Sequence, residues 1–428
     1  MPLLQALVAY WFLVHGTRTK ADLKRGKQHC PRTAAHNAPQ LTQPASTNDC
    51  RQFFLAFNEY VNKRILDETS RHTQVSTDMK DILCVSLSDI LRDDGGQHQQ
   101  MFVERFIANG GSALIKLSKK DATIISKMWS LTKILFEKID HPSTAGEQIS
   151  LSENVPKTID LRYQKLPGDK QATKKDVGYH YVEIGHGDQE MLQTIGKIVG
   201  DPSISNAAID SLDLLFNIGE KVASMVISRL SETDLETSET LVDCLLGSTK
   251  EKSTLTSFQR LARYMQADPE QTETENLGSH CDWSIFTIIP VSDEPGLQVF
   301  DTQEKWWLSP EVAIQNHCER SVRISDQELD IDRNDSYVVL MAGKWFELLT
   351  GGKAESCIHR VISPRDTPRR FSAPFFLRLQ LPILEAIESI VLEHPTDIES
   401  SRRAMMKHMW ALRHASTVVP LGTKKPRI

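Results

Sequence analysis

The sequence predicts an α+β protein, in which a helical N-terminal region precedes a β-rich barrel or sandwich. Up to about residue 250 the apolar residues recur mainly at three- and four-residue spacing, which is typical of amphipathic helices. After about residue 253 the apolar runs become short, β-branched or aromatic, and Pro, Gly, Asp and Asn separate them, which is typical of closely spaced strands. The chain of 428 residues is long enough for two or three domains.

Composition and charge narrow the class of protein. Hydrophobic residues make up 40% and charged residues 25%, which excludes collagen-like, coiled-coil and wholly disordered chains. The net charge of −6 provides no positive field for a polyanion, so we expect no nucleic-acid partner. The 7 cysteines are odd in number and no pair has CxxC spacing, so we expect reduced thiols and a cytoplasmic location, with neither a disulfide framework nor a zinc ribbon.

The N-terminus allows two interpretations. The apolar run Leu3–Val14 is shorter than the roughly 20 residues needed to span a bilayer, so we expect no stable membrane insertion. Basic residues follow this run, whereas a signal peptide carries them before it. A dispensable or buried segment is therefore favoured over an organelle or secretory signal. Residues 16–48 lack hydrophobic periodicity and read as a linker or disordered tail.

Apolar spacing predicts the helices and first strand of the N-terminal region. A strand-like run, Ala113–Leu117, follows the break Asn109-Gly110-Gly111, and the polar stretch 141–178 is expected to be an exposed connection. Helices are expected over Phe53–Ile65, Met79–Leu91, Ile124–Leu135 and Ala207–Leu230, and near Ile383–Leu392 and Arg402–Leu412.

The β-rich part contains a set of candidate metal ligands. Residues two apart on a strand share a face, so His280 and Asp282 can converge on one ion. That spacing alone is a weak signal, because His186-Gly187-Asp188 repeats it by chance. A second candidate histidine, His359, lies in a strand-like segment further along. Two imidazoles and one carboxylate on one face of an octahedral ion leave three positions open, which suits non-haem Fe(II) and O₂.

A candidate anion site follows the last histidine. Arg370 precedes the hydroxyl of Ser372 by two residues, and the two groups together can hold a carboxylate by charge-assisted hydrogen bonds. The alternative for Arg370 is a structural ion pair with a carboxylate elsewhere in the barrel.

The segment from Phe258 to Leu379 resembles the catalytic domain of the Fe(II)/2-oxoglutarate-dependent dioxygenases, in the branch similar to isopenicillin N synthase. Each block that carries the resemblance is weak alone, but all occur in the expected order. The blocks are Arg260-Leu261-Ala262-Arg263-Tyr264, His280–Trp283, Gly296-Leu297-Gln298-Val299 with Trp306-Trp307, Leu349–Lys353 running into Ser356 and His359-Arg360-Val361, and Arg370-Phe371-Ser372.

This resemblance implies a double-stranded β-helix, or jelly roll, flanked by helices. It implies that His280, Asp282 and His359 bind Fe(II), and that Arg370 and Ser372, with help from Tyr264, bind the distal carboxylate of 2-oxoglutarate. The implied reaction couples oxidative decarboxylation of 2-oxoglutarate, with O₂, to hydroxylation, desaturation or cyclisation of a small molecule. The alternatives are a non-catalytic binding module on this scaffold and an iron oxidase that does not use 2-oxoglutarate. The complete ligand set favours an enzyme.

Several residues near these blocks are expected to be structural. Cys281 and Cys357 flank the ligands and should be buried apolar residues, while Trp306 and Trp307 should pack the barrel. Ala262 and Lys344 depart from the family's usual Asn and Asp and bear on local hydrogen bonding. The sequence between Trp307 and Tyr337 is longer than usual and is expected to be a surface loop, with His317-Cys318-Glu319 solvated rather than metal-binding.

The expected organisation has four parts, and neither the substrate nor the oligomeric state can be read from them. The parts are an apolar N-terminus with a disordered tail (1–50), a mostly helical region (51–250), the Fe(II)/2-oxoglutarate dioxygenase jelly-roll domain (251–382), and C-terminal helices with a tail (383–428).

Overall fold

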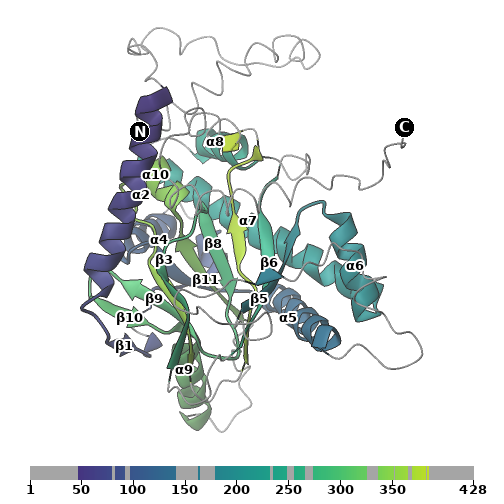
Figure 1. The fold of residues 1–428 in the computed structure, drawn as a ribbon. Coiled ribbons are helices and arrows are strands. Elements are labelled where there is room, and N and C mark those ends of the chain that lie inside the picture. The colour runs from purple at the N-terminus through teal and green to yellow at the C-terminus, as the bar shows by residue number, and fades with distance from the viewer. Residues whose placement is uncertain are drawn as a thin grey trace, which may run out of the picture.

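A computed structural model gives the fold, in which two β-sheets stand face to face between layers of helices (Figure 1). It describes residues 47–79, 82–91, 97–140, 162–163, 179–231, 235–247, 255–265, 273–324, 336–350, 352–364, 369–381 and 383–384.

The smaller sheet has five strands, in the order β1-β10-β9-β12-β7. Its central strands are antiparallel, and β12 lies between β9 and β7. Only the edge strand β1 runs parallel to its neighbour β10. The bounds are β1 (Val75–Ser76), β7 (Glu273–His280), β9 (Leu297–Asp301), β10 (Trp306–Leu308) and β12 (His359–Pro364).

The larger sheet has nine strands, in the order β2-β3-β11-β8-β14-β6-β5-β4, with β13 also paired to β6. The strands at its centre are buried on both faces, which explains their continuous apolar sequences. The bounds are β2 (Cys84–Ser86), β3 (Ser112–Lys116), β4 (Arg162–Tyr163), β5 (Tyr179–Gly185), β6 (Phe258–Met265), β8 (Phe286–Pro290), β11 (Tyr337–Ala342), β13 (Arg369–Ser372) and β14 (Phe375–Leu377).

From β6 onward the chain crosses repeatedly between the two sheets. The larger sheet contains β6, β8, β11, β13 and β14, whereas the smaller sheet contains β7, β9, β10 and β12. All pairings within this set are antiparallel. This alternation makes a double-stranded β-helix, so the jelly-roll prediction is confirmed.

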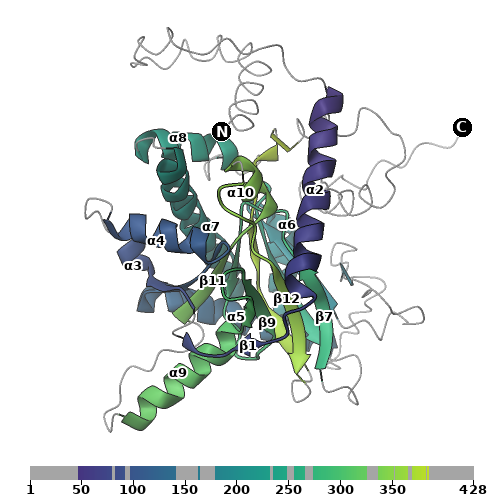
Figure 2. The ribbon, with the colours of Figure 1, turned by 90° about the vertical axis from the view of Figure 1, so that its left-hand side faces the viewer.

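Helices cover both outer sides of the strands. Helices α4, α5 and α7 pack against the larger sheet, and α2 packs beside β7 on the opposite side, as Figure 2 shows. None of the helices within the described residues is long and apolar enough to cross a membrane. The bounds are α2 (Thr47–Thr69), α3 (Leu87–Ile90), α4 (Gln97–Ala108), α5 (Lys119–Asp140), α6 (Gln189–Val199), α7 (Pro202–Ser231), α8 (Leu235–Leu246), α9 (Pro310–Ile324) and α10 (Lys344–Leu349).

The helices expected around Phe53–Ile65, Ile124–Leu135 and Ala207–Leu230 are present as α2, α5 and α7, and the expected strand is β3. The helix expected over Met79–Leu91 is wrong. Residues 84–86 form strand β2, which pairs in parallel with β3, and only α3 is helical there. Tertiary pairing with β3 overrides the local helical spacing in this segment.

The long segment between Trp307 and Tyr337 is not simply a surface loop, because its first half forms α9. Pro310 takes the first helical position, where a missing backbone N–H is tolerated, and the acidic Glu311 lies in the first turn. Ala313 and Ile314 are fully buried against the small sheet. The helix therefore belongs to the barrel wall, and residues 325–335 lie outside the described part.

Some expectations fall on residues outside the described ranges. These are the N-terminal apolar run and tail, nearly all of the connection 141–178, and the C-terminal helices beyond residue 384.

Candidate metal centre

The two candidate histidines are direct neighbours across the small sheet. His280 is the last residue of β7 and His359 is the first of β12, and their Cα atoms are register partners in the antiparallel pair. Their ring centroids are 4.2 Å apart. Although they are far apart in sequence, one strand pairing therefore brings both imidazoles to one end of the barrel.

Asp282 completes the cluster from the turn after β7, so the expectation that it shares a strand with His280 is wrong, because the strand ends at His280. Its Oδ1 lies 3.5 Å from Nε2 of His280, and its Oδ2 lies 3.4 Å from Nε2 of His359. The possible ligand atoms of the three side chains all lie within 4.8 Å of one another. The side chain of His280 is 30% exposed, whereas those of Asp282 and His359 are 12% and 5% exposed. The cluster is therefore accessible from the His280 side.

Backbone carbonyls orient both imidazoles. Nδ1 of His280 lies 2.7 Å from the carbonyl oxygen of Gly278, and Nδ1 of His359 lies 3.3 Å from that of Cys357. If each Nδ1 donates its proton to the carbonyl, each Nε2 lone pair points toward Asp282. A second ring nitrogen fixed in this way is the usual support of a metal-binding histidine.

The Asp282 carboxylate is held by its neighbours as an anion. Thr287 Oγ1 donates to Oδ2 at 2.7 Å. Burial alone would raise the pKa of Asp282, but His359 and His280 outweigh it and place that pKa well below the usual range. Burial and the adjacent His359 lower the pKa of His280, so a neutral imidazole is favoured there. Burial alone would lower the pKa of His359, but Asp282 outweighs it and raises that pKa. A metal therefore has to displace a proton from this imidazole, because an ionised carboxylate and neutral imidazoles are the forms that bind metal.

This donor set fits a ferrous ion. Two imidazole nitrogens and one carboxylate supplied from one side leave further coordination positions open for other ligands. Within the part of the chain that the structure describes, this is the one group of three or more His, Cys, Asp or Glu side chains close enough to hold a metal. His317 and Cys318, on α9, do not belong to such a group.

The three candidate 2-oxoglutarate residues also lie together, on β6 and β13. Arg370 and Tyr264 are register partners, and Ser372 pairs with Ala262. The side chains of Arg370, Ser372 and Tyr264 are 1–3% exposed. Tyr264 and Ala262 pack with Val361 of the opposite sheet, so this face of β6 points into the barrel.

Arg370 crosses the barrel interior to a carboxylate that the sequence analysis did not single out. Its Nη2 donates to Oε1 of Glu311 at 2.5 Å, and both side chains are 1% exposed. Its Nε donates to the carbonyl of Glu294 at 3.2 Å. Nη1 is buried without a hydrogen-bond partner within the described ranges, so it can still donate to a ligand.

Glu311 is fixed from the other side by the backbone. Its Oε2 accepts hydrogen bonds from the N–H groups of Gly296 and Leu297, at 3.0 and 2.9 Å. Burial raises the pKa of Glu311, although Arg370 and these N–H groups oppose the effect. The structural ion pair that the sequence analysis gave as the alternative role of Arg370 is therefore present. It uses Nη2 of the guanidinium and leaves Nη1 without a partner among the described residues.

Because Gly296 has no side chain, the side chain of Arg370 can occupy the space beside it. A Cβ atom at this position would lie 2.6 Å from Cδ of Arg370 and 2.5 Å from the carbonyl oxygen of Ile362. The second of these atoms belongs to the backbone of β12, so neither neighbour can move freely.

We expect Gly296→Ala to displace Arg370 and to destabilise the protein by about 1–3 kcal/mol, the usual cost of overpacking. Urea denaturation checks the stability, and 2-oxoglutarate affinity reports on Arg370. The matched control is Gly185→Ala, because a Cβ there meets nothing closer than 4.0 Å. Equal affinity and stability in the two variants would show that Arg370 tolerates the added methyl group.

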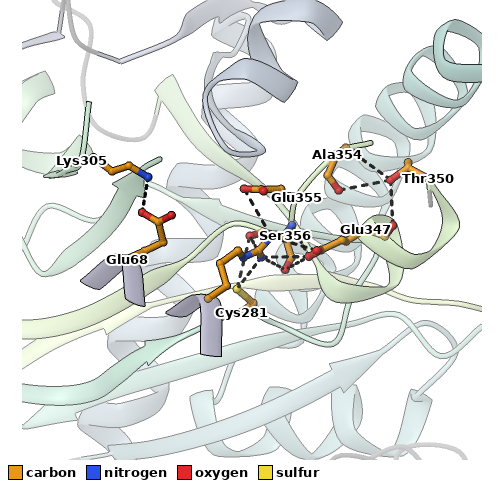
Figure 3. A network of polar contacts seen from close by, with 9 residues as sticks. Glu68, Cys281, Lys305, Glu347, Thr350, Ala354, Glu355 and Ser356 are labelled. Carbon is orange, nitrogen blue, oxygen red and sulfur yellow. Dashed lines mark hydrogen bonds and ion pairs between the residues drawn. The ribbon is translucent and has the colours of Figure 1, made fainter. Parts of the chain in front are cut away.

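A second buried ion pair joins α2 to α10, and hydrogen bonds to Ser356 connect it to the segment before His359. Nη1 and Nη2 of Arg64 donate to the two oxygens of Glu347, each at 3.1 Å, and Nη2 also reaches Oγ and the carbonyl of Ser356 at 2.9 Å. Glu347 in turn accepts from the backbone N–H and Oγ of Ser356, at 2.9 and 2.6 Å. Figure 3 shows Glu347, Ser356 and Cys281 in this network. Through Ser356, this network of Arg64 and Glu347 fixes the backbone three residues before His359.

Three of the residues that the sequence analysis expected to be structural are buried. Cys281, Cys357 and Trp307 are at most 4% exposed, and burial raises the pKa of both thiols. The chance motif also has a structural role, because His186 lies 3.2 Å from Asp213 of α7 and Asp188 caps α6 by accepting from the N–H of Met191.

Comparison with known proteins finds one family that the β-rich part of the chain resembles. Residues 256–379 match the family described as the 2OG-Fe(II) oxygenase superfamily. Gibberellin 20 oxidases 1-B and 1-D of Triticum aestivum are each 30% identical to this chain over 163 residues, which is 37% of this chain and 38% of the relative. The match thus spans well under half the length of these relatives.

Two solved structures that align with most of this chain come from a plant and a bacterium. The dioxygenase for auxin oxidation 1 from Arabidopsis thaliana, in its 2-oxoglutarate complex, aligns with 70% of this chain and 94% of its own, at 12% identity and a TM-score of 0.45. A protein of the 2OG-Fe(II) oxygenase family from Caulobacter crescentus aligns with 77% of this chain and 98% of its own, at 18% identity and a TM-score of 0.48.

Proposed function

We propose that this protein is an Fe(II)- and 2-oxoglutarate-dependent dioxygenase that oxidises a small molecule, because residues 256–379 match the 2OG-Fe(II) oxygenase superfamily. The observation that carries the proposal is the meeting of His280, Asp282 and His359 at one end of the barrel. A cytoplasmic location and the lack of a nucleic-acid partner remain predictions from composition.

In this proposal the three clustered side chains hold the ferrous ion. Arg370 and Ser372 bind the distal carboxylate of 2-oxoglutarate, and Tyr264 borders it. When bound, iron, O₂ and 2-oxoglutarate together supply a strong oxidant, and the protein has to keep water away from it. The burial of Arg370, Ser372 and Tyr264 excludes water from the cosubstrate end of the site.

The contact with Glu311 holds the Arg370 guanidinium in place before 2-oxoglutarate binds. Glu311 and the carbonyl of Glu294 fix Nη2 and Nε, so the free Nη1 is held at one position in the barrel. A fixed guanidinium loses little conformational entropy when it binds a carboxylate, which favours affinity. Glu311 acts here as a positioning residue.

The same ion pair also favours a second candidate, an iron oxidase that does not use 2-oxoglutarate. In that case Glu311 alone satisfies the charge of Arg370, and the guanidinium has only a structural role. The two candidates differ in whether 2-oxoglutarate is consumed.

Turnover of 2-oxoglutarate tests the proposal and separates the candidates. We expect the purified protein to convert 2-oxoglutarate to succinate slowly, with a requirement for Fe(II) and O₂. Arg370→Gln should raise the KM for 2-oxoglutarate at least about tenfold, because a hydrogen bond to a charged group contributes about 1.5–3 kcal/mol. The control is Arg369→Gln, since Arg369 is the exposed neighbour on the same strand. An iron-loaded wild type that binds and consumes no 2-oxoglutarate would support the oxidase instead.

A further inference from the structure

Arg378, directly after β14, is a buried cation that has no counter-ion in contact among the described residues. It is 1% exposed, and none of Nε, Nη1 and Nη2 has a hydrogen-bond partner in the described part of the chain. Its backbone N–H donates to Oγ of Ser257 at 3.0 Å, which fixes the main chain but not the side chain. All five guanidinium N–H groups are thus available to a ligand.

Aromatic rings form one wall beside this guanidinium. Its Cζ lies 4.5 Å from the ring centroid of Phe258 and 5.9 Å from that of Phe376, and these two rings lie 4.9 Å apart. Arg260 packs on the same two rings, but Glu183 neutralises it with hydrogen bonds of 2.5 and 3.0 Å. Arg378 therefore carries the one positive charge of this cluster that no carboxylate of the described ranges neutralises by contact.

The charge on Arg378 persists at neutral pH. Burial lowers the pKa of Arg378 to about 10, with Glu183 acting against this effect. Leaving a buried guanidinium charged and unpaired is strongly unfavourable, because it loses its hydration without gaining hydrogen bonds. A ligand that accepts hydrogen bonds from the Arg378 guanidinium would explain why this charge is buried.

Arg378 lies on the side of the sheet that faces the metal centre. Phe376 is the register partner of Thr287, whose hydroxyl donates to Asp282. Cross-strand partners point to the same face, and the Arg378 guanidinium packs on the rings of the partners Phe376 and Phe258, so it lies on this face, toward the barrel interior. The negative charge of Asp282 also acts on Arg378, which agrees with this placement.

We propose that Arg378 binds the carboxylate of the substrate, which is a small, largely apolar organic acid whose body lies beside Phe258 and Phe376 near the metal centre. This inference rests on the proposed dioxygenase function. A planar guanidinium binds a carboxylate through two parallel hydrogen bonds. One unneutralised cation matches a monoanion, whereas a phosphate dianion would call for a second one, and Arg260 is already paired.

Matched acids and amides test this assignment. We expect benzoate or phenylacetate to bind the full-length protein, loaded anaerobically with Fe(II) and saturating 2-oxoglutarate, at least about tenfold more tightly than benzamide or phenylacetamide. Saturating 2-oxoglutarate keeps the probes away from Arg370, and isothermal titration calorimetry measures the affinities. Arg378→Gln should remove the preference for the acid, and Arg369→Gln should keep it. The assignment is overturned when neither acid is preferred, or when the preference survives in Arg378→Gln.

Thermal stability gives a second readout that needs no probe. Met has a similar length and no charge, so Arg378→Met should raise the melting temperature of the ligand-free protein by several degrees if Arg378 is kept for a ligand. A structural role predicts a lower melting temperature for the same variant, which would count against the assignment.

The charge-transfer band of the Fe(II)–2-oxoglutarate complex separates failure of this inference from failure of the proposed function. A band that forms normally, together with no preference for the acids, overturns the assignment of Arg378 alone. A band that does not form overturns the dioxygenase itself.

Discussion

Asp282→Ala is expected to abolish iron binding and 2-oxoglutarate turnover. The variant removes the one anion that lies between the two imidazoles, at 3.5 and 3.4 Å from their Nε2 atoms. Loss of a residue that only supports a metal ligand commonly costs roughly 10–100-fold in metal affinity or activity, so loss of a direct ligand should cost more than about 100-fold. Metal analysis after anaerobic loading with Fe(II), together with succinate formation, measures the effect.

The matched control for this prediction is Asp293→Ala. The Asp293 side chain is 67% exposed and pairs with Lys133 at the surface, so its loss should leave iron content unchanged. Iron bound at the wild-type level by Asp282→Ala would show that Asp282 is not a ligand, and the alternative of a non-catalytic binding module on this scaffold would then be favoured.

Glu347→Ala is expected to destabilise the protein by about 3–5 kcal/mol, the usual effect of removing one partner from a buried ion pair. The Arg64 and Glu347 side chains are 8% and 2% exposed, so the change leaves a buried cation with only the more distant and exposed carboxylate of Glu355, 3.6 Å away. It also leaves the N–H and hydroxyl of Ser356 without their acceptor. Urea denaturation of the iron-free protein measures the loss in free energy of unfolding.

A surface pair supplies the comparison. Lys221 and Glu239 are 3.1 Å apart, with side chains 51% and 44% exposed, so Glu239→Ala should cost at most about 1 kcal/mol. Because Ser356 precedes His359 by three residues, Glu347→Ala should also weaken iron binding. If Glu347→Ala is no more destabilising than Glu239→Ala, then α2 is not anchored through this network.

The candidate metal centre was predictable because its residues belong to an ordered set of motifs. The spacing of His280 and Asp282 predicts a shared face, and the resemblance to the dioxygenase family added His359, Arg370, Ser372 and Tyr264. The structure places the first three within 4.8 Å of one another. Their assignment as ligands remains a prediction that the variants above test.

Contacts that join distant parts of the chain carried no sequence signal. Arg64 and Glu347 are 283 residues apart, and neither lies in a motif. Glu311 lies in a segment that the sequence alone marks as an insertion, and only the folding of α9 onto the barrel brings it to Arg370. A buried ion pair is set by tertiary packing, which the local pattern around each partner does not contain.

Several strands could not be predicted from hydrophobic periodicity, and β7 and β5 show the physical reason. Strand β7, with the sequence ETENLGSH, has almost no apolar residues and is held by its pairing with β12. Strand β5 follows a polar stretch and pairs with β6. Their register partners, rather than their own hydrophobicity, determine these strands, so periodicity could not reveal them.

Anaerobic titration with Fe(II) and then 2-oxoglutarate tests the central claim most directly, because it requires both the metal centre and Arg370 but no knowledge of the substrate. We predict a metal-to-ligand charge-transfer band that saturates at one iron per chain, weakens in Arg370→Gln and is absent in Asp282→Ala. A wild-type protein that is folded and loaded with iron, yet develops no band when 2-oxoglutarate is added, would contradict the proposal.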